Sequence, residues 1–302
     1  MRIFRLSVFV TMLMLLSFST LQAQLVVKTN RTVSDLVKNV LAGGGVDIIN
    51  IQYSVGTGNI GFFNGKKSNI GLDSGLILST GKVIDAIGPN NMGNQGSSNN
   101  LPGDADLQLL SPNFPTYDAT WISFSFSPQA NQVKFRFVFA SEEYPESIAK
   151  NFNDVFGFFL IGQGINGAPM WNSNGTPNID TVNLAVIPGT TTPVAVNTIN
   201  QGFPSGSWPA SNCLSANPNY VSNAVYYNAN SGGTSIINME GFTDVFTARA
   251  SVSCGALYTI KMFICDVSDG ALNSAVFIGA RSFELPTISL SQAWNQGNSF
   301  ND

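Results

Sequence analysis

Two neighbouring stretches of the chain place an apolar side chain at every second position. The first covers residues 121–127 and the second residues 133–139. A period of two is typical of a β-strand that buries one face. Because the turn-forming residues 128–131 separate the two stretches, the pattern predicts an antiparallel hairpin. Its buried face would carry Ile122, Phe124, Phe126, Val133, Phe135, Phe137 and Phe139.

Further apolar runs predict more strands. Residues 155–161 are apolar almost throughout, which is typical of a central strand covered on both faces. The other predicted strands are residues 182–187, 245–250, 258–265 and 275–280.

One helix is predicted near the N-terminus. Thr32 is a good N-cap, residues 33–41 carry apolar side chains at helical spacing, and Gly43 begins a glycine run that ends the helix. Residues 90–103 and 202–219 are long Asn/Gly- and Pro/Ser-rich loops. The fold expected is mainly β, a β-sandwich or jelly-roll-like arrangement with one N-terminal helix.

The composition removes several kinds of chemistry. Charged residues make up 11% of the chain, against roughly 25% in an ordinary soluble domain. The 14 Lys and Arg residues against 18 Asp and Glu give a net charge of −4, so no basic footprint for nucleic acid exists. The chain has no His, which excludes Ser-His-Asp and Cys-His catalysis and His-ligated zinc.

Residues 1–23 have the pattern of a secretory signal peptide. Arg2 and Arg5 precede the apolar residues 6–16, and cleavage is expected before Gln24. The apolar run of about 12 residues is shorter than the about 20 needed to span a bilayer. We therefore expect a mature chain with no membrane span, secreted or at the extracellular cell surface.

The mature chain is expected to form one domain. Residues 24–285 carry the strand pattern, and residues 286–302 are polar, without periodicity, as in a tail or the start of a linker. Since no sorting domain or anchor follows in this sequence, we expect either a fragment or a released protein.

The three cysteines lie in different settings. Cys265 belongs to an apolar strand and is expected to be a buried small hydrophobe. Cys213 and Cys254 lie in loop-like contexts, and export favours oxidation. We therefore predict a disulfide between Cys213 and Cys254. A catalytic thiol is not expected, because the chain offers no His to activate one.

The scarce acidic residues are concentrated between predicted strands, in residues 140–154 and 266–275. Calcium binds six to eight hard oxygens, which carboxylates and Asn side chains supply. Loops of a sandwich can bring such residues together, so a structural calcium ion is one hypothesis. The candidate ligands are Glu142, Glu143, Asp154, Asp266, Asp269 and Asn273.

Other interpretations of the acids stay open. Asp and Asn side chains commonly bond their own backbone in turns, and this also applies to a third cluster, Asp104 and Asp106. Two carboxylates at a defined separation could instead hydrolyse a glycosidic bond. Glu142, Glu143, Asp154 and Asp269 are the candidates for such chemistry.

The segment Phe139-Ala-Ser-Glu-Glu-Tyr-Pro-Glu146, with Phe152-Asn-Asp-Val-Phe-Gly-Phe-Phe-Leu160, closely resembles the choice-of-anchor L domain. The resemblance extends over most of the mature chain, through residues 71–81, 103–107, 183–194, 240–243 and 266–277. Similar domains usually have Asp where this chain has Asn273. Asn still offers an oxygen, so a metal site would lose one charge but keep the ligand.

The resemblance implies an exported surface protein, of a kind found chiefly in Bacteroidetes-type bacteria. Many such proteins look like cargo of type IX secretion, held at the surface by various C-terminal anchors. The family has no well-established activity that the resemblance could assign to individual residues of this chain. The resemblance therefore implies location and architecture more than mechanism.

Aromatic side chains in the Asn-rich loops are candidates for ligand binding. Sugar rings stack on such aromatics, and Trp171, Trp208 and Tyr227 are the residues expected to do so. The alternative is that these side chains fix long loops to the body of the domain.

Our leading hypothesis is a non-catalytic binding or adhesion module, with calcium as a structural ion and a glycan or a surface protein as partner. A carboxylate-based glycan-active enzyme and a purely structural stalk domain are the alternatives.

Overall fold

The computed structural model describes residues 24–43, 46–90, 96–165, 170–171, 177–178, 180–230 and 237–281, with the backbone alone at 170–171 and 177–178. The predicted signal peptide, residues 1–23, and the predicted tail, residues 286–302, lie outside this part of the chain.

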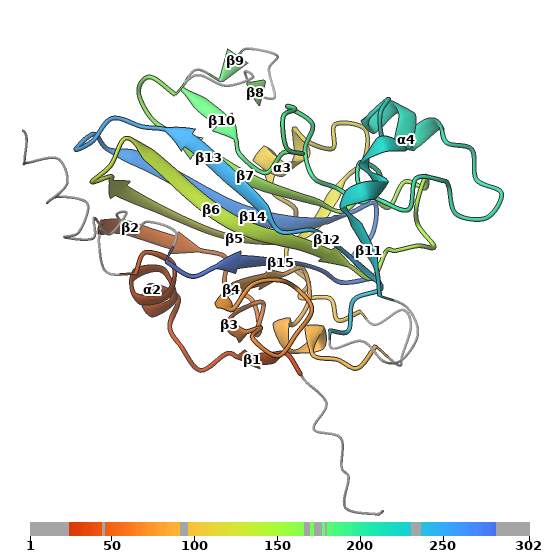
Figure 1. Ribbon diagram of the computed structural model, residues 1–302, viewed down its shortest axis with the longest axis horizontal. Helices are drawn as coiled ribbons and strands as arrows, with labels where there is room; N and C mark the ends of the chain where they lie inside the picture. Colours follow the sequence, from red (N-terminus) through yellow and green to blue (C-terminus); the bar gives the residue numbers. More distant parts are fainter. Residues whose placement is uncertain are drawn as a thin grey trace, which may run out of the picture.

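The described strands form two antiparallel sheets, as expected for a sandwich (Figure 1). One sheet has eight strands, in the order β1-β3-β4-β15-β6-β12-β11, with β13 also paired to β6. Its strands are β1 (Val26–Lys28), β3 (Ile60–Asn64), β4 (Ser74–Ser79), β6 (Gln132–Ser141), β11 (Tyr227–Ala229), β12 (Gly241–Thr243), β13 (Phe246–Ser251) and β15 (Ser274–Gly279).

The second sheet has five strands, in the order β10-β7-β14-β5-β2. They are β2 (Asp47–Tyr53), β5 (Thr116–Ser127), β7 (Val155–Ile161), β10 (Thr181–Asn183) and β14 (Tyr258–Val267). A small separate pair consists of β8 (Met170–Trp171) and β9 (Pro177–Asn178). The predicted strands all appear, although β10 is shorter than the apolar run 182–187 suggests.

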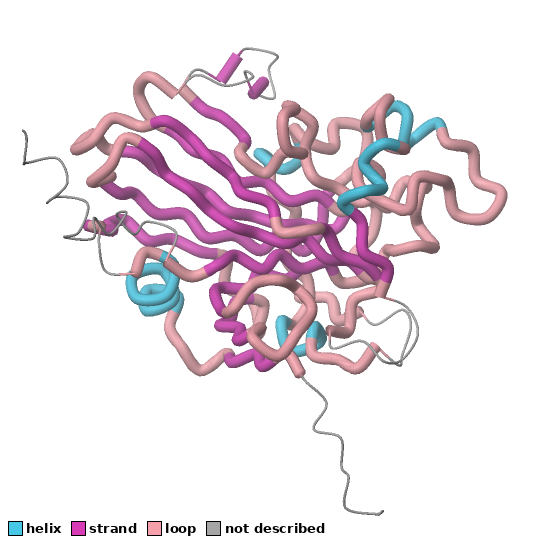
Figure 2. Tube along the Cα trace, viewed as in Figure 1, coloured by secondary structure: helices cyan, strands magenta, loops and turns pink. Residues whose placement is uncertain are grey.

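Helical segments are short and lie around the sheets (Figure 2). The predicted N-terminal helix is present as α2 (Val33–Asp35), which continues into a wider π turn, η1 (Leu36–Leu41). Thr32 caps it by accepting a hydrogen bond from the Asp35 N–H. The others are η2 (Val83–Ala86), α3 (Ala105–Gln108), α4 (Ser211–Ala216) and η3 (Ser222–Tyr226).

The main apolar core fills the space between the two sheets. The alternating side chains of β5 and β6 all point into it, as their pattern predicts. Aromatic rings meet there from both sheets, with ring centroids of Phe135 and Phe158 4.4 Å apart and those of Phe137 and Phe156 5.3 Å apart. The predicted buried faces are therefore confirmed.

The predicted hairpin of β5 and β6 is wrong. β5 pairs with β14 and β2, whereas β6 pairs with β15, β12 and β13. Residues 128–131 carry the chain from one sheet to the other, so the two apolar faces pack against each other instead of lying side by side. Alternation reports which face is buried but not which strand is the neighbour, because either arrangement buries the same side chains.

Both sheets are also covered on their outer faces. The eight-stranded sheet packs Val138, Ala140 and Phe277 beneath a second apolar cluster that includes Leu25 and Met239. The five-stranded sheet is covered by a third cluster, in which Leu107 of α3 meets Phe159 and Phe263. This double coverage explains why β7 and β15 are apolar almost throughout.

The predicted disulfide is not formed, because Cys213, Cys254 and Cys265 are all free thiols. Cys213 is buried in α4, where its sulfur lies 3.4 Å from Asn197 Oδ1. Cys254 is exposed in the turn between β13 and β14, at the opposite end of the strands from α4 (Figure 1). The sequence context indicated two loops but not their separation. Cys265 is buried in β14, as predicted.

Candidate functional site

The two predicted acidic segments meet where four strands end. Residues 142–154 connect β6 to β7, and residues 268–273 connect β14 to β15. The register pairs Ser141 with Ser274 and Val155 with Cys265. The Glu142 N–H donates to the Asn273 carbonyl oxygen at 3.0 Å, which joins the two segments directly. We call this end of the sandwich the acidic rim.

Strand alternation divides the rim between two layers. Phe139 of β6 belongs to the inner core and Ala140 to the outer cluster. Glu142, in the turn after β6, is close enough to Asp85 to be affected by its charge, and Asp85 belongs to η2, which packs in the outer cluster. In β14, Ile264 faces the inner core and Cys265 the outer cluster, so Asp266 faces inward. The acids therefore do not form one group.

Asp154 is the centre of the inner group. It is fully buried, and its side chain contacts that of Asp266. Its Oδ1 accepts a hydrogen bond from the Val267 N–H at 3.0 Å, and its Oδ2 accepts one from the Ser274 hydroxyl at 2.6 Å. Burial raises the pKa of Asp154 to about 7, although these hydrogen bonds act in the opposite direction.

Asp266 and Glu143 flank Asp154 and are nearly as deeply buried, each 3% exposed. Burial, with the nearby charge of Asp154, raises the pKa of Asp266 well above its usual range. Burial, again with the charge of Asp154, raises the pKa of Glu143 to about 8. Within the described structure, Asp266 Oδ1 and Glu143 Oε2 are buried without a hydrogen-bond partner. Asp269 is exposed at the outside of this group.

Glu142 belongs to the outer group. It is 1% exposed, and neither carboxylate oxygen finds a hydrogen-bond partner in the part of the chain that the structure describes. Burial, with the charges of Glu240, Asp85 and Glu146, raises its pKa to about 9. Asn273 is buried close by, where its amide donates to Asp85 Oδ2 at 3.2 Å.

The six predicted metal ligands therefore do not surround one position. Among the described residues, no group of three or more Cys, Asp and Glu side chains is arranged around a metal-sized space. Asn273 instead joins loops, since its Oδ1 also accepts the Ser97 N–H at 3.0 Å. What the structure does bring together is Glu143, Asp154 and Asp266.

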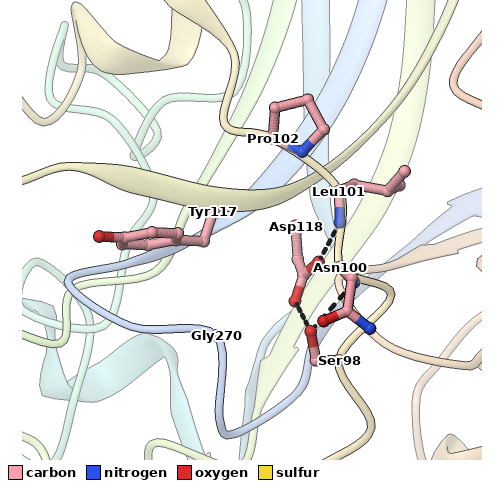
Figure 3. Close-up of a pocket in the computed structure, with 7 residues that line it drawn as sticks. All are labelled: Ser98, Asn100, Leu101, Pro102, Tyr117, Asp118 and Gly270. Carbon is pink, nitrogen blue, oxygen red and sulfur yellow. Dashed lines mark hydrogen bonds between the residues drawn. The ribbon is translucent and has the colours of Figure 1, made fainter.

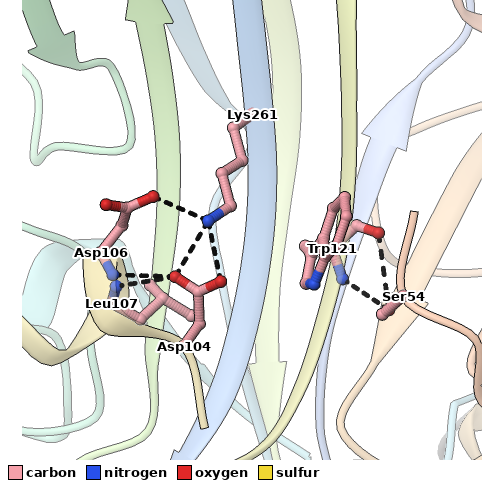
Figure 4. Close-up of polar contacts among 6 residues, drawn as sticks. All are labelled: Ser54, Asp104, Asp106, Leu107, Trp121 and Lys261. Carbon is pink, nitrogen blue, oxygen red and sulfur yellow. Dashed lines mark hydrogen bonds and ion pairs between the residues drawn. The ribbon is translucent and has the colours of Figure 1, made fainter. Parts of the chain in front are cut away.

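The third acidic cluster has a structural role (Figure 4). Asp104 caps α3 by accepting hydrogen bonds from the N–H groups of Asp106 and Leu107, at 2.9 and 3.3 Å. Lys261 Nζ lies 2.8 Å from Asp104 Oδ2 and 2.7 Å from Asp106 Oδ2. The same ammonium lies 5.7 Å from the centroid of the Trp121 ring. This cluster therefore fits the capping and turn interpretation.

An open hollow of about 560 Å³ lies at the acidic rim, where Gly270 of the connection between β14 and β15 faces Asp118 (Figure 3). Asp118 has a left-handed backbone, with a φ of 49°, and its carboxylate fixes the neighbouring loop. It accepts hydrogen bonds from the Ser98 hydroxyl at 2.6 Å and from the Leu101 N–H at 2.7 Å. The described lining consists of Ser98, Asn100, Leu101, Pro102, Tyr117, Asp118 and Gly270.

No pattern in the sequence marks this hollow. Tyr117 is 41% exposed at the start of β5, and Gly270 belongs to the connection between β14 and β15. The one local signal is the dipeptide Tyr117-Asp118, separated by two residues from the predicted strand at 121–127. Residues 98–102 approach β5 through long-range contacts that no short pattern encodes.

The predicted ligand-binding aromatics have different environments. Trp208 is 53% exposed, with Lys150 Nζ 5.9 Å from its ring centroid. Tyr227 is half-buried, and its ring centroid lies 4.9 Å from that of Tyr144. Tyr227 therefore fits the alternative in which an aromatic fixes a loop. Trp171 lies in β8, and its side chain is outside the described structure.

The sequence of the whole domain identifies the family. The model of the choice-of-anchor L domain matches residues 25–284. The chain belongs to the choice-of-anchor L family. No curated protein and no solved structure matches the chain.

Choice-of-anchor L membership places the chain among extracellular or surface-associated proteins in general terms. The family is not known to be catalytic. In the described residues, no helix is both long and apolar enough to cross a membrane.

Proposed function

We propose that this choice-of-anchor L domain is an exported, non-catalytic module that binds a neutral glycan in the hollow at Tyr117 and Asp118. The observation that carries the proposal is the composition of the hollow. It combines an exposed aromatic ring with hydroxyl, amide and backbone groups. A sugar ring can stack on the aromatic face while its hydroxyl groups bond to the polar wall.

The charges around the hollow favour an uncharged ligand. Asp118 lies in the wall, and Asp266 is close enough to be affected by its charge. Lys and Arg side chains are absent from the described lining. An anionic ligand would therefore meet repulsion without a compensating cation. Hydroxyl groups, in contrast, can donate to acceptors such as the Asn100 side chain.

The accessibility of the acids argues against the glycan-active enzyme. Glycoside hydrolysis needs two carboxyl groups on either side of the bond that breaks. Glu142, Glu143 and Asp154 are at most 3% exposed, so a sugar cannot reach them. The fourth candidate, Asp269, is exposed, but the other three cannot serve as its catalytic partner. The described wall of the hollow offers a single carboxylate, Asp118, and both of its oxygens accept hydrogen bonds.

Binding to a panel of soluble polysaccharides tests the proposal. We expect Tyr117→Ala to weaken the affinity at least tenfold, measured by isothermal titration calorimetry. Tyr53→Ala is the matched control, because Tyr53 is similarly exposed, at 44%, on β2 of the same sheet. If Trp208→Ala weakened binding and Tyr117→Ala did not, the ligand would occupy the Asn-rich loops. A wild-type protein that binds neither polysaccharides nor surface extracts would favour the stalk domain.

Export is a further part of the proposal. We propose that residues 1–23 are removed and that the chain reaches the outside of a Bacteroidetes-type cell by type IX secretion. Mass spectrometry of the exported protein should find an N-terminus at Gln24. Loss of export in a strain without the type IX machinery would support the route, and unchanged export would exclude it.

A further inference from the structure

Two oxygen atoms of the inner acidic group are buried without a partner in the described structure, Glu143 Oε2 and Asp266 Oδ1. Both belong to side chains that are 3% exposed, and both flank the fully buried Asp154. Leaving a buried acceptor unpaired is costly, and the cost is larger for a charged group. The arrangement therefore needs something that these oxygens can bind.

The surrounding charges do not supply it. Asp269 faces the group from the connection between β14 and β15, and Asp118 faces it from β5. The charge of Lys150 acts on Glu143 and lowers its pKa, but the Lys150 ammonium lies over the Trp208 ring. The charges that act on the group are thus mostly negative. Either protons or a metal cation must compensate it.

We propose that the inner acidic group, Glu143, Asp154 and Asp266, binds one calcium ion between the two sheets. The ligands are hard oxygens, which calcium and magnesium prefer and zinc does not. Hydroxyl groups lie beside the carboxylates, since Ser274 Oγ is 2.6 Å from Asp154 Oδ2 and 2.8 Å from Ser141 Oγ.

Calcium fits this setting better than magnesium. Magnesium demands near-ideal octahedral geometry and keeps several waters, whereas calcium accepts six to eight oxygens in irregular arrangements. No three described acidic or thiol side chains already surround a metal-sized position. Asp154 and Asp266, whose side chains are in contact, and Glu143, whose Oε2 has no hydrogen-bond partner in the described structure, are the residues that would hold the ion. The proposal does not depend on the hollow or on its ligand.

Titration of chelator-treated full-length protein with calcium chloride tests the proposal. We expect calorimetry and native mass spectrometry to find one calcium ion per chain. At calcium one hundred times above Kd, the Tm should rise by about 5–10 °C. Magnesium chloride should bind at least tenfold more weakly.

Variants locate the ion. Asp154→Asn and Asp266→Asn keep the side-chain volume and should each weaken calcium binding at least tenfold. Glu142→Gln is the matched control, because it removes a buried acid on the outer side of the eight-stranded sheet and should leave the calcium response unchanged. If the Asn variants fail to fold, the wild-type stoichiometry still decides whether a site exists.

Two results would overturn the proposal. If the wild-type protein neither binds calcium nor changes its Tm in millimolar calcium, Asp154 and Asp266 share a proton instead. If Glu142→Gln removes the calcium response while Asp266→Asn keeps it, the ion lies on the outer face. Neither result bears on glycan binding at Tyr117, which is measured separately.

Discussion

Asp154 and Asp266 lie in side-chain contact between the two sheets, one directly before β7 and the other near the end of β14. The register that pairs Val155 with Cys265 brings them together, because Asp154 and Asp266 are the next residues along the two strands. The pair forms a polar end to the apolar core. The pair is also joined to the eight-stranded sheet, since the Ser274 hydroxyl of β15 donates a hydrogen bond to Asp154.

The link between the sheets gives the first prediction, which concerns Ser274→Ala. A hydroxyl group has one proton, and the shorter contact, 2.6 Å to Asp154 Oδ2, should receive it. The variant leaves one oxygen of a fully buried carboxylate without its donor. We expect a loss of about 1–3 kcal/mol in the free energy of unfolding, measured by urea denaturation.

Ser268→Ala is the control for this variant. The Ser268 hydroxyl bonds the Asn151 carbonyl oxygen at an exposed position of the same rim, so its loss should cost at most about 0.5 kcal/mol. Equal losses in the two variants would show that the hydrogen bond to Asp154 stabilises the fold no more than an exposed hydrogen bond does.

The second prediction concerns the pH dependence of stability in the presence of a chelator. Burial and the neighbouring carboxylates raise the pKa of Glu142 to about 9, whereas in the unfolded chain a Glu ionises near pH 4.3. Between these values the folded state holds a proton that the unfolded state has lost. Stability from this group is complete below about pH 4 and falls as the pH rises, by at most about 1.4 kcal/mol per unit.

Glu142→Gln has no proton to lose, so its stability should fall less steeply between pH 5 and 9. Urea denaturation at four pH values in this interval measures the slope. Asp73→Asn, at an exposed position, should follow the wild-type curve. Parallel curves for Glu142→Gln and the wild type would mean that Glu142 has the same pKa in the folded and unfolded states, and would contradict the prediction.

The strand pattern predicts faces reliably because burial acts on each side chain separately. Phe124, Phe126 and Phe135 are all buried where alternation places them. Pairing depends on which strand arrives from elsewhere in the chain. The predicted hairpin of β5 and β6 is wrong for this reason. β5 pairs with β14 and β6 pairs with β15, and both partners are more than a hundred residues away in the sequence.

The candidate site was predicted only in part, for a related reason. Clustering in the sequence located both acidic segments, and strand order does bring them to one rim. Glu142 nevertheless lies on the outer side of the eight-stranded sheet, whereas Asp266 lies between the two sheets. The positions of acidic residues in the sequence do not show this separation. The hollow at Tyr117 was missed because its wall comes from a loop whose path is fixed by the Asp118 carboxylate.

The third prediction concerns the thiols. Cys254 is exposed, whereas Cys213 and Cys265 are fully buried. Burial raises the pKa of Cys213 to about 11 and that of Cys265 well above its usual range, which leaves little reactive thiolate. Iodoacetamide should therefore label Cys254 alone in the folded protein and all three cysteines in urea. One labelled thiol in urea without reductant would instead support the disulfide between Cys213 and Cys254.

The fourth prediction concerns Lys261, whose side chain is 16% exposed and whose partner Asp104 is 13% exposed. Removing one partner leaves the other charge largely buried and, for Asp104, also removes the cap of α3. We expect Asp104→Ala and Lys261→Met each to cost about 2–4 kcal/mol in the free energy of unfolding. Because the Asp106 side chain is 47% exposed, Asp106→Ala should lower the free energy of unfolding by at most about 1 kcal/mol.

A double-mutant cycle separates the ion pair from the cap. The double variant should cost less than the sum of the single variants, because neither charge is then left alone. The coupling should also be larger for Asp104 than for Asp106, since both oxygens of Asp104 lie within 3.0 Å of Lys261 Nζ. Urea denaturation of the wild type, the three single variants and the two double variants measures both couplings. Zero coupling would mean that Asp104 acts through the cap alone, and that Lys261 is held by the Phe263 ring, 4.7 Å away.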